Sequence, residues 1–220
     1  LLLTSGEASH PRSSTVSRED LGARRRAEGE RAAAELAPAA HVVHVGLPDG
    51  GLAERQEEIS TAVASFCSAG TLVLAPWTSD GHPDHDAAGR ATRTAVLSRT
   101  SAGEAGVNLA HYLVWFWHWG SPTRLPRGLV RVPLSEEDRA AKCDALAHHV
   151  TQVRPLSDRP GDEVLLGPHV LAHFDRSAEL FVLAAPDQAA VFDRVHSDAE
   201  DPWDVDTSWY ERRKRELVTQ

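Results

Sequence analysis

The chain has 220 residues, the length of one large domain or two small ones. Its 41% hydrophobic and 25% charged residues are typical of a soluble globular protein, and no apolar stretch approaches the roughly 18 residues of a transmembrane helix. A formal net charge of −9 argues against a general nucleic-acid-binding protein, which needs a basic surface.

Cysteine and methionine content add two expectations. Only Cys67 and Cys143 are present, which excludes a disulfide framework and a four-cysteine zinc site and favours a reducing compartment, the cytoplasm. The chain contains no methionine and opens on three leucines, as in a buried strand. We therefore expect a fragment that lacks its natural N-terminus, so that any signal peptide would precede Leu1.

The predicted elements alternate between strands and helices. Short apolar or β-branched runs predict strands, and Ala-, Arg- and Glu-rich or helically periodic stretches predict helices. Ser135 with Asp138 resembles a capping box that starts a helix. In chain order we expect a strand at 1–3, helix 18–36, strand 41–47, helix 52–69, strand 71–75, helix 84–98, strands 111–119 and 129–134, helix 135–150 and strand 179–183.

Connections between these elements are too long for hairpins, which favours a mostly parallel sheet. The predicted fold class is therefore α/β, Rossmann-like and doubly wound, with helices on both faces of the sheet. After residue 185 the composition becomes acidic, and we predict a linker over residues 186–206 and the start of another domain over 207–220.

The loop from Trp77 to His85 is the best candidate for chemistry. It directly follows the strand at 71–75, where ligands bind in open α/β sheets. Pro83 should keep His82 extended in the loop and leave His85 in the first helical turn. Two imidazoles among the carboxylates Asp80, Asp84 and Asp86 suit a zinc site. The alternative is a polar surface turn in which Asp84 caps the helix.

This loop and five other segments resemble, in the same order, the zinc-dependent de-N-acetylases of the PIG-L/LmbE family. The resemblance covers residues 1–184 and rests on these segments: Thr4-Ser5-Gly6-Glu7 (T-D-G-E in the family), Arg25-x-x-Glu28, Leu47-Pro48-Asp49-Gly50, Asp80-Gly81-His82-Pro83-Asp84-His85, Lys142 to Gln152, and Glu179-Leu180-Phe181. The family's first signature, H-P-D-D-E, is missing and is expected one strand and one helix before Thr4.

The resemblance implies a role for each matching residue. His85 would be a metal ligand, His82 would stabilise the oxyanion and protonate the departing amine, and Asp84 would orient His82. Arg25 and Asp49 would contact the substrate. The other two zinc ligands and the general base would belong to the H-P-D-D-E segment.

Several of these residues also have simpler explanations. Arg25 lies among Arg24, Arg26, Glu28 and Glu30, as on a solvated helix face. Asp49 precedes Gly50, which turn chemistry alone explains. The aromatic stretch 112–119 is apolar on both alternating faces, which favours a buried central strand over a sugar-stacking platform.

A second resemblance lies at the C-terminal end. Asp201-Pro202-Trp203 and the segment from Ser208 to Arg215 are similar to the opening of NodS-like SAM-dependent methyltransferases. The chain ends before a glycine-rich SAM loop, and a basic amphipathic helix would explain the segment equally well.

Together with the family resemblance, these observations predict that residues 1–185 form a zinc-dependent deacetylase domain. It would remove an N-acetyl group from an N-acetylglucosamine-type sugar or glycoconjugate, with SAM serving only a fused methyltransferase. We expect no nucleic-acid partner and no membrane span. The alternative is a catalytically inactive domain of the same fold that acts as a scaffold or binding unit.

Overall fold

The computed structural model describes residues 1–183, which form two compact units. The first comprises Leu1–Gly51 and Ser135–Asp175; of the described residues, the second comprises Leu52–Leu134 and 176–183. The predicted linker and the methyltransferase-like segment lie outside the described residues. Within residues 1–183, no helix has the length and apolar character needed to cross a membrane.

The first unit is built around helix α1 (Arg18–Leu36), whose bounds agree with the sequence prediction. Ser17 caps α1 by accepting a hydrogen bond from the Asp20 amide. Helices α5 (Glu136–Ala147) and α6 (Val150–Val153) pack against α1, and α7 (Pro168–Leu171) follows them in the chain. The predicted Ser135–Asp138 capping box is present at the start of α5.

The predicted strands at 1–3 and 41–47 are reduced to a short parallel ladder in this unit. Leu2 forms a parallel bridge with His44, and the amides of Val45 and Leu47 donate to the carbonyls of Leu2 and Leu3. Helix α1 thus connects two parallel segments, as a βαβ crossover does.

The second unit contains a four-stranded sheet in the order β1-β2-β4-β3. Its strands are β1 (Leu72–Pro76), β2 (Asn108–Tyr112), β3 (Leu129–Pro133) and β4 (Ala178–Leu183). The remaining elements are the 3₁₀ turns η1 (Leu52–Arg55) and η2 (Pro122–Arg124) and the helices α2 (Gln56–Ala64), α3 (Pro83–Ser101) and α4 (Phe116–Trp119).

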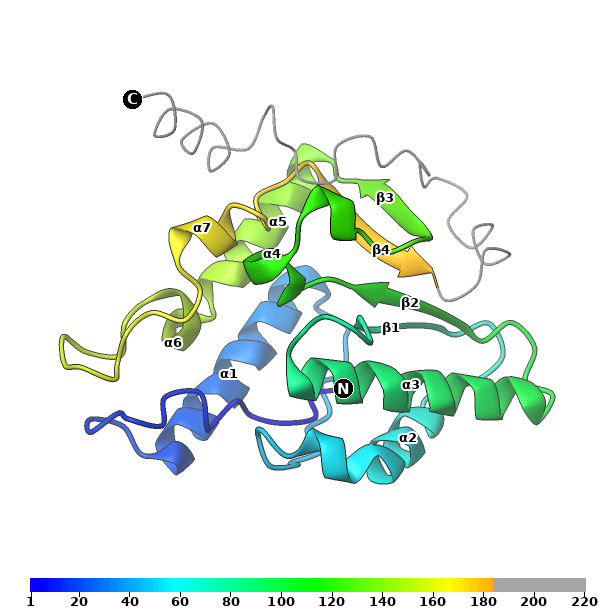
Figure 1. Ribbon diagram of the computed structural model, residues 1–220, viewed down its shortest axis with the longest axis horizontal. Helices are drawn as coiled ribbons and strands as arrows, with labels where there is room; N and C mark the ends of the chain where they lie inside the picture. Colours follow the sequence, from blue (N-terminus) through cyan, green and yellow to red (C-terminus); the bar gives the residue numbers. More distant parts are fainter. Residues whose placement is uncertain (184–220) are drawn as a thin grey trace. The chain divides into compact units, whose positions relative to one another are not determined.

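Helix α3 packs against β1 and β2, and α2 packs against α3, as Figure 1 shows. Helix α3 buries small residues, among them Ala87, Ala91 and Ala95, which are at most 1% exposed. Gly89 allows the closest approach, because a Cβ there would lie 2.4 Å from the Pro76 carbonyl oxygen. The absence of a side chain at Gly89 therefore lets α3 lie directly against the end of β1.

The α/β class is confirmed, but this sheet is not mostly parallel. Only β1 and β2 pair in parallel, whereas β4 runs antiparallel to both β2 and β3. The reason lies where the chain re-enters the unit: Ala178 pairs with Pro133, and the Leu134 amide donates to the Ser177 carbonyl. Strand β4 begins beside the end of β3 and can only run back along it.

The predicted strand at 111–119 is wrong. Strand β2 ends at Tyr112, and residues 116–119 form the single-turn helix α4. The chain turns here because the amides of Val114, Trp115 and Phe116 all donate to the side chain of Asp80, which leaves them unavailable for strand pairing.

Candidate functional site

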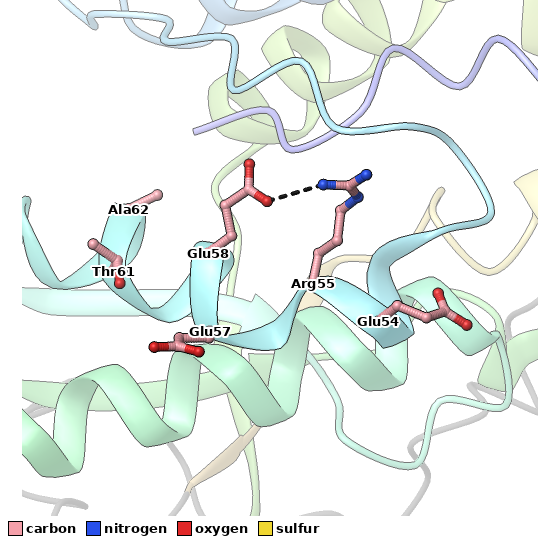
Figure 2. Close-up of a pocket in the computed structure, with 6 residues that line it drawn as sticks. All are labelled: Glu54, Arg55, Glu57, Glu58, Thr61 and Ala62. Carbon is pink, nitrogen blue, oxygen red and sulfur yellow. Dashed lines mark hydrogen bonds and ion pairs between the residues drawn. The ribbon is translucent and has the colours of Figure 1, made fainter.

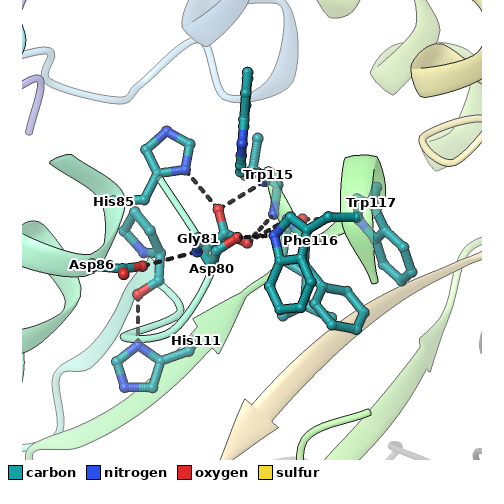
Figure 3. Close-up of polar contacts among 12 residues, drawn as sticks. Asp80, Gly81, His85, Asp86, His111, Trp115, Phe116 and Trp117 are labelled. Atoms are coloured by element: carbon teal, nitrogen blue, oxygen red, sulfur yellow. Dashed lines mark hydrogen bonds and ion pairs between the residues drawn. The ribbon is translucent and has the colours of Figure 1, made fainter. Parts of the chain in front are cut away.

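The loop between β1 and α3 is organised around one buried carboxylate, that of Asp80 (Figure 3). Asp80 is 0% exposed and accepts backbone hydrogen bonds from Val114 at 3.0 Å, Trp115 at 2.7 Å and Phe116 at 3.0 Å. It also lies 2.6 Å from Nδ1 of His85. These contacts join the loop, the first turn of α3 and the segment before α4.

The surroundings of Asp80 favour its ionised form. Burial raises the pKa of Asp80, but the hydrogen bonds from His85 and the three backbone amides outweigh it, so that the pKa lies below its ordinary value. Because an ionised carboxylate only accepts hydrogen bonds, Nδ1 of His85 carries the proton. In the neutral imidazole, Nε2 then keeps its lone pair.

His82 lies beside His85. It is the N-cap residue of α3 and has extended backbone angles, as the following Pro83 predicts. The ring centroids of His82 and His85 are 4.5 Å apart, and the ring of Trp115 lies 5.3 Å from that of His82. The two imidazoles therefore form one cluster with an aromatic neighbour.

Asp84 is buried and has a structural contact. Its Oδ1 accepts a hydrogen bond from the Leu52 amide at 3.2 Å, which ties the start of η1 to α3. The alternative in which Asp84 caps the helix is wrong, because the N-cap residue is His82. Asp86 accepts instead from the Gly81 amide within the loop.

The turn after β2 places large aromatic side chains around the same loop. Phe116 and Trp117 are buried, and the guanidinium of Arg176 lies over the Trp117 ring. Trp115, by contrast, is 37% exposed and stacks at 4.2 Å on His118. The sequence interpretation missed this exposed indole, because it took the whole stretch as a buried strand.

Trp119 fixes the loop from the other end of α4. Its indole Nε1 donates to the Asp80 carbonyl at 2.8 Å. A Cβ at Gly81, which has a φ of 89°, would lie 2.4 Å from that nitrogen. The glycine before His82 is thus required both by its backbone conformation and by the packing of Trp119.

Arg25 and Asp49 lie in the first unit, whereas His82, Asp84 and His85 lie in the second. Arg25 is half-buried: its Nη1 donates to the Gly6 carbonyl at 2.7 Å and its Nε to Thr151 Oγ1 at 3.3 Å. Burial lowers the pKa of Arg25, opposed by the charges of Asp49, Glu28 and Glu7. The solvated helix face considered for Arg25 does not describe it, because its guanidinium is inside the unit.

Asp49 joins its turn to the loop that follows Thr4. Its Oδ2 accepts from the Ala8 amide at 2.9 Å and its Oδ1 from Thr4 Oγ1 at 3.4 Å, while the Asp49 amide donates to Glu7 at 2.9 Å. Gly50 follows with a φ of 83°. The turn explanation of Asp49 therefore has direct support in the structure.

The donor set for zinc contains one residue with suitable geometry. His85 has its Nδ1 hydrogen-bonded to a buried carboxylate, which is the arrangement usual for a histidine that ligates a metal through Nε2. Among residues 1–183, no three His, Cys, Asp or Glu side chains are grouped so that they could hold a metal ion. His85 fits as one ligand, and the described residues do not complete its coordination shell.

An open hollow elsewhere in the second unit contains none of the predicted residues. It lies along η1 and α2, where Arg55 pairs with Glu58 at 3.1 Å (Figure 2). The residues that line it are Glu54, Arg55, Glu57, Glu58, Thr61 and Ala62. All belong to one helical segment and most are exposed, so the hollow lacks the opposing wall that would enclose a ligand.

Comparison with known proteins gives one family. Residues 1–96 match the family PIG-L, described as GlcNAc-PI de-N-acetylase. The match includes the Asp80–His85 loop and the positions of Arg25 and Asp49, and it spans less than half of the chain. No curated protein matches the chain.

Proposed function

We propose that this protein is a zinc-dependent hydrolase of the cytoplasm that removes the N-acetyl group from an N-acetylglucosamine-type sugar or glycoconjugate. The observation that carries the proposal is the pair of adjacent imidazoles at the start of α3, in which a buried carboxylate anchors His85 through Nδ1. The match of residues 1–96 to a de-N-acetylase family supports the same reaction.

Amide hydrolysis needs two kinds of assistance, and the two imidazoles suit different ones. The carbonyl is a poor electrophile and the amine a poor leaving group. Zinc, when bound, polarises the carbonyl and lowers the pKa of a bound water. His85 would hold the metal through Nε2. His82, in its protonated form, would donate a proton to the departing nitrogen.

Asp84 and the aromatic turn would keep these groups in place. Asp84 ties the first turn of α3 to η1 by accepting a hydrogen bond from the Leu52 amide. This contact would fix the helix end that carries His82 and His85. In the proposal Asp84 also orients His82.

Arg25 and Asp49 are the proposed substrate-binding residues. Nη2 of Arg25 is buried and makes no hydrogen bond to any described residue, which supports a ligand oxygen as its acceptor. A guanidinium donates well to hydroxyl or phosphate oxygens. The carboxylate of Asp49 would accept from a sugar hydroxyl while it holds its turn.

The test is the release of acetate. The full-length gene product, supplied with zinc, is incubated with N-acetylglucosaminyl-phosphatidylinositol and with simpler N-acetylglucosaminides, and acetate and free amine are measured. Acetate and free amine should be formed in equal amounts, and neither should be formed after a chelator has removed the zinc. Binding of these glycans without acetate release would favour the alternative, an inactive scaffold of the same fold.

The proposal extends to a coupled methylation. Deacetylation turns an amide nitrogen into an amine with a free lone pair, which can attack the methyl group of SAM. The segment 201–215 supports this step by its similarity to NodS-like methyltransferases. When the full-length protein is given the sugar and methyl-labelled SAM, the label should be transferred to the deacetylated sugar only. Label on the acetylated sugar, or no label on the free amine, would contradict the coupling.

A further inference from the structure

The buried carboxylate of Asp80 accepts four hydrogen bonds, two at each oxygen. Its Oδ1 accepts from the amides of Val114 and Phe116, and its Oδ2 accepts from the Trp115 amide and from His85. Three of the donors are backbone amides, and the fourth is the imidazole of His85. The contact with His85, at 2.6 Å, is the shortest of the four.

This contact determines what His85 can do. A carboxylate at Nδ1 selects the tautomer with its proton on Nδ1, and it also restricts rotation of the ring. The side chain of His85 is 28% exposed, and its described hydrogen bond uses Nδ1 alone. Nε2 is thereby left as the nitrogen that can meet a ligand.

The same carboxylate fixes the neighbours of His82. The amides that it accepts from belong to the turn that carries Trp115, whose ring lies 5.3 Å from that of His82. One buried side chain thus ties the imidazole pair to its aromatic neighbour. An asparagine would fill the same space, but its NH₂ group would face a donor.

We infer that Asp80 is a positioning residue of the site: it holds the His85 imidazole with Nε2 presented to a metal cation. The inference rests on the proposed function for the identity of that cation. The role of Asp80 itself concerns the tautomer and orientation of His85, which can be measured without metal or substrate.

The test uses long-range ¹H–¹⁵N NMR correlation of imidazoles in the metal-free, ¹⁵N-labelled full-length protein, with His85→Gln to assign the signals. Wild-type His85 should carry its proton on Nδ1, and Asp80→Asn should populate the Nε2–H tautomer. On titration with zinc, Asp80→Asn should weaken zinc binding at His85 by about 10- to 100-fold. Asp80→Glu, which keeps the carboxylate, should retain part of the Nδ1–H tautomer and part of the zinc affinity.

Asp86→Asn is the matched control. It makes the same chemical change in the adjoining first turn of α3, at a carboxylate that accepts from the Gly81 amide, and it should leave the tautomer of His85 unchanged. A wild-type His85 protonated on Nε2 would overturn the inference, even if Asp80→Asn fails to fold. An unchanged tautomer in folded Asp80→Asn would overturn it too. An Nδ1–H tautomer with no response to zinc would support it and contradict the proposed function.

Discussion

Trp115 is predicted to lie in a buried strand, but its side chain is exposed. An exposed indole within 5.3 Å of His82 offers an apolar surface beside a polar pair. Such a surface suits the C–H face of a pyranose ring, and aromatic stacking contributes about 1 kcal/mol. A substrate ring bound there would lie next to the proposed proton donor.

Trp115→Ala should therefore raise KM for an N-acetylglucosaminide about fivefold, equivalent to about 1 kcal/mol of binding, and change kcat less. Steady-state kinetics of the full-length protein measure both. Phe66→Ala is the matched control, because it removes another exposed aromatic ring of the same unit. A KM that stays the same in Trp115→Ala would exclude stacking at this position.

In the first unit, Asp162 is expected to make the folding stability depend on pH. Hydrogen bonds from Ser13, Ser157 and Thr15 lower its pKa to about 2. The contact from Thr15 measures 2.5 Å and links the loop before α1 to the loop after α6. Because the unfolded chain has a pKa of about 3.9, folding favours the ionised form of this group.

The contribution of Asp162 to stability is therefore complete above about pH 4 and is lost as the pH falls towards 2. Urea unfolding of the wild type and Asp162→Asn between pH 2 and 6 tests this. The two proteins should differ most at pH 6 and converge near pH 2. A difference that is independent of pH would contradict the assigned ionisation.

At the scale of elements, the packing of α3 on β1 determines where His82 and His85 lie. Gly89 is one turn beyond His85, and its missing side chain brings α3 to within a short distance of the Pro76 carbonyl. In an exposed helix interior, Gly→Ala stabilises by about 1 kcal/mol. Here the added methyl group would clash with the Pro76 backbone, so Gly89→Ala should destabilise the protein instead.

Gly89→Ala should lower the free energy of unfolding by about 1–3 kcal/mol, the usual cost of overpacking. Thermal or urea denaturation gives the value. Thr94→Ala, on the exposed face of the same helix, should change stability by no more than about 0.5 kcal/mol. A more stable Gly89→Ala protein would mean that α3 does not need this close approach.

Elements with strong local signals were predictable from sequence. Helix α1 was predicted with its observed bounds, and Ser135 and Asp138 identified the capping box of α5, because helix propensity and capping depend on near neighbours. The extended conformation of His82 before Pro83 is equally local.

The turn after β2 was not predictable in this way. Nothing within residues 111–119 indicates that the strand should end. The cause is Asp80, more than thirty positions earlier, because its carboxylate accepts hydrogen bonds from three consecutive amides that strand pairing would otherwise use. For the same reason Asp80 was considered only as one of several nearby carboxylates. The direction of β4 likewise depends on contacts between Pro133 and Ala178, which are distant in sequence.

On the scale of the whole molecule, both units are discontinuous in sequence. Strand β4 completes the sheet of the second unit only after the chain has added α5, α6 and α7 to the first. The predicted catalytic and metal-binding residues belong to the second unit and the predicted substrate-binding residues to the first. Each unit can be tested by its own variants.

The central claim is that two adjacent histidines have different tasks, His85 as a metal ligand and His82 as a proton donor. The most direct test measures bound zinc and acetate release together in full-length His82→Ala and His85→Ala. His85→Ala should lose both. His82→Ala should keep its zinc and lose about 10²- to 10⁴-fold in rate, the usual contribution of a general acid. Near-full acetate release by His82→Ala, or wild-type zinc content in His85→Ala, would contradict the account.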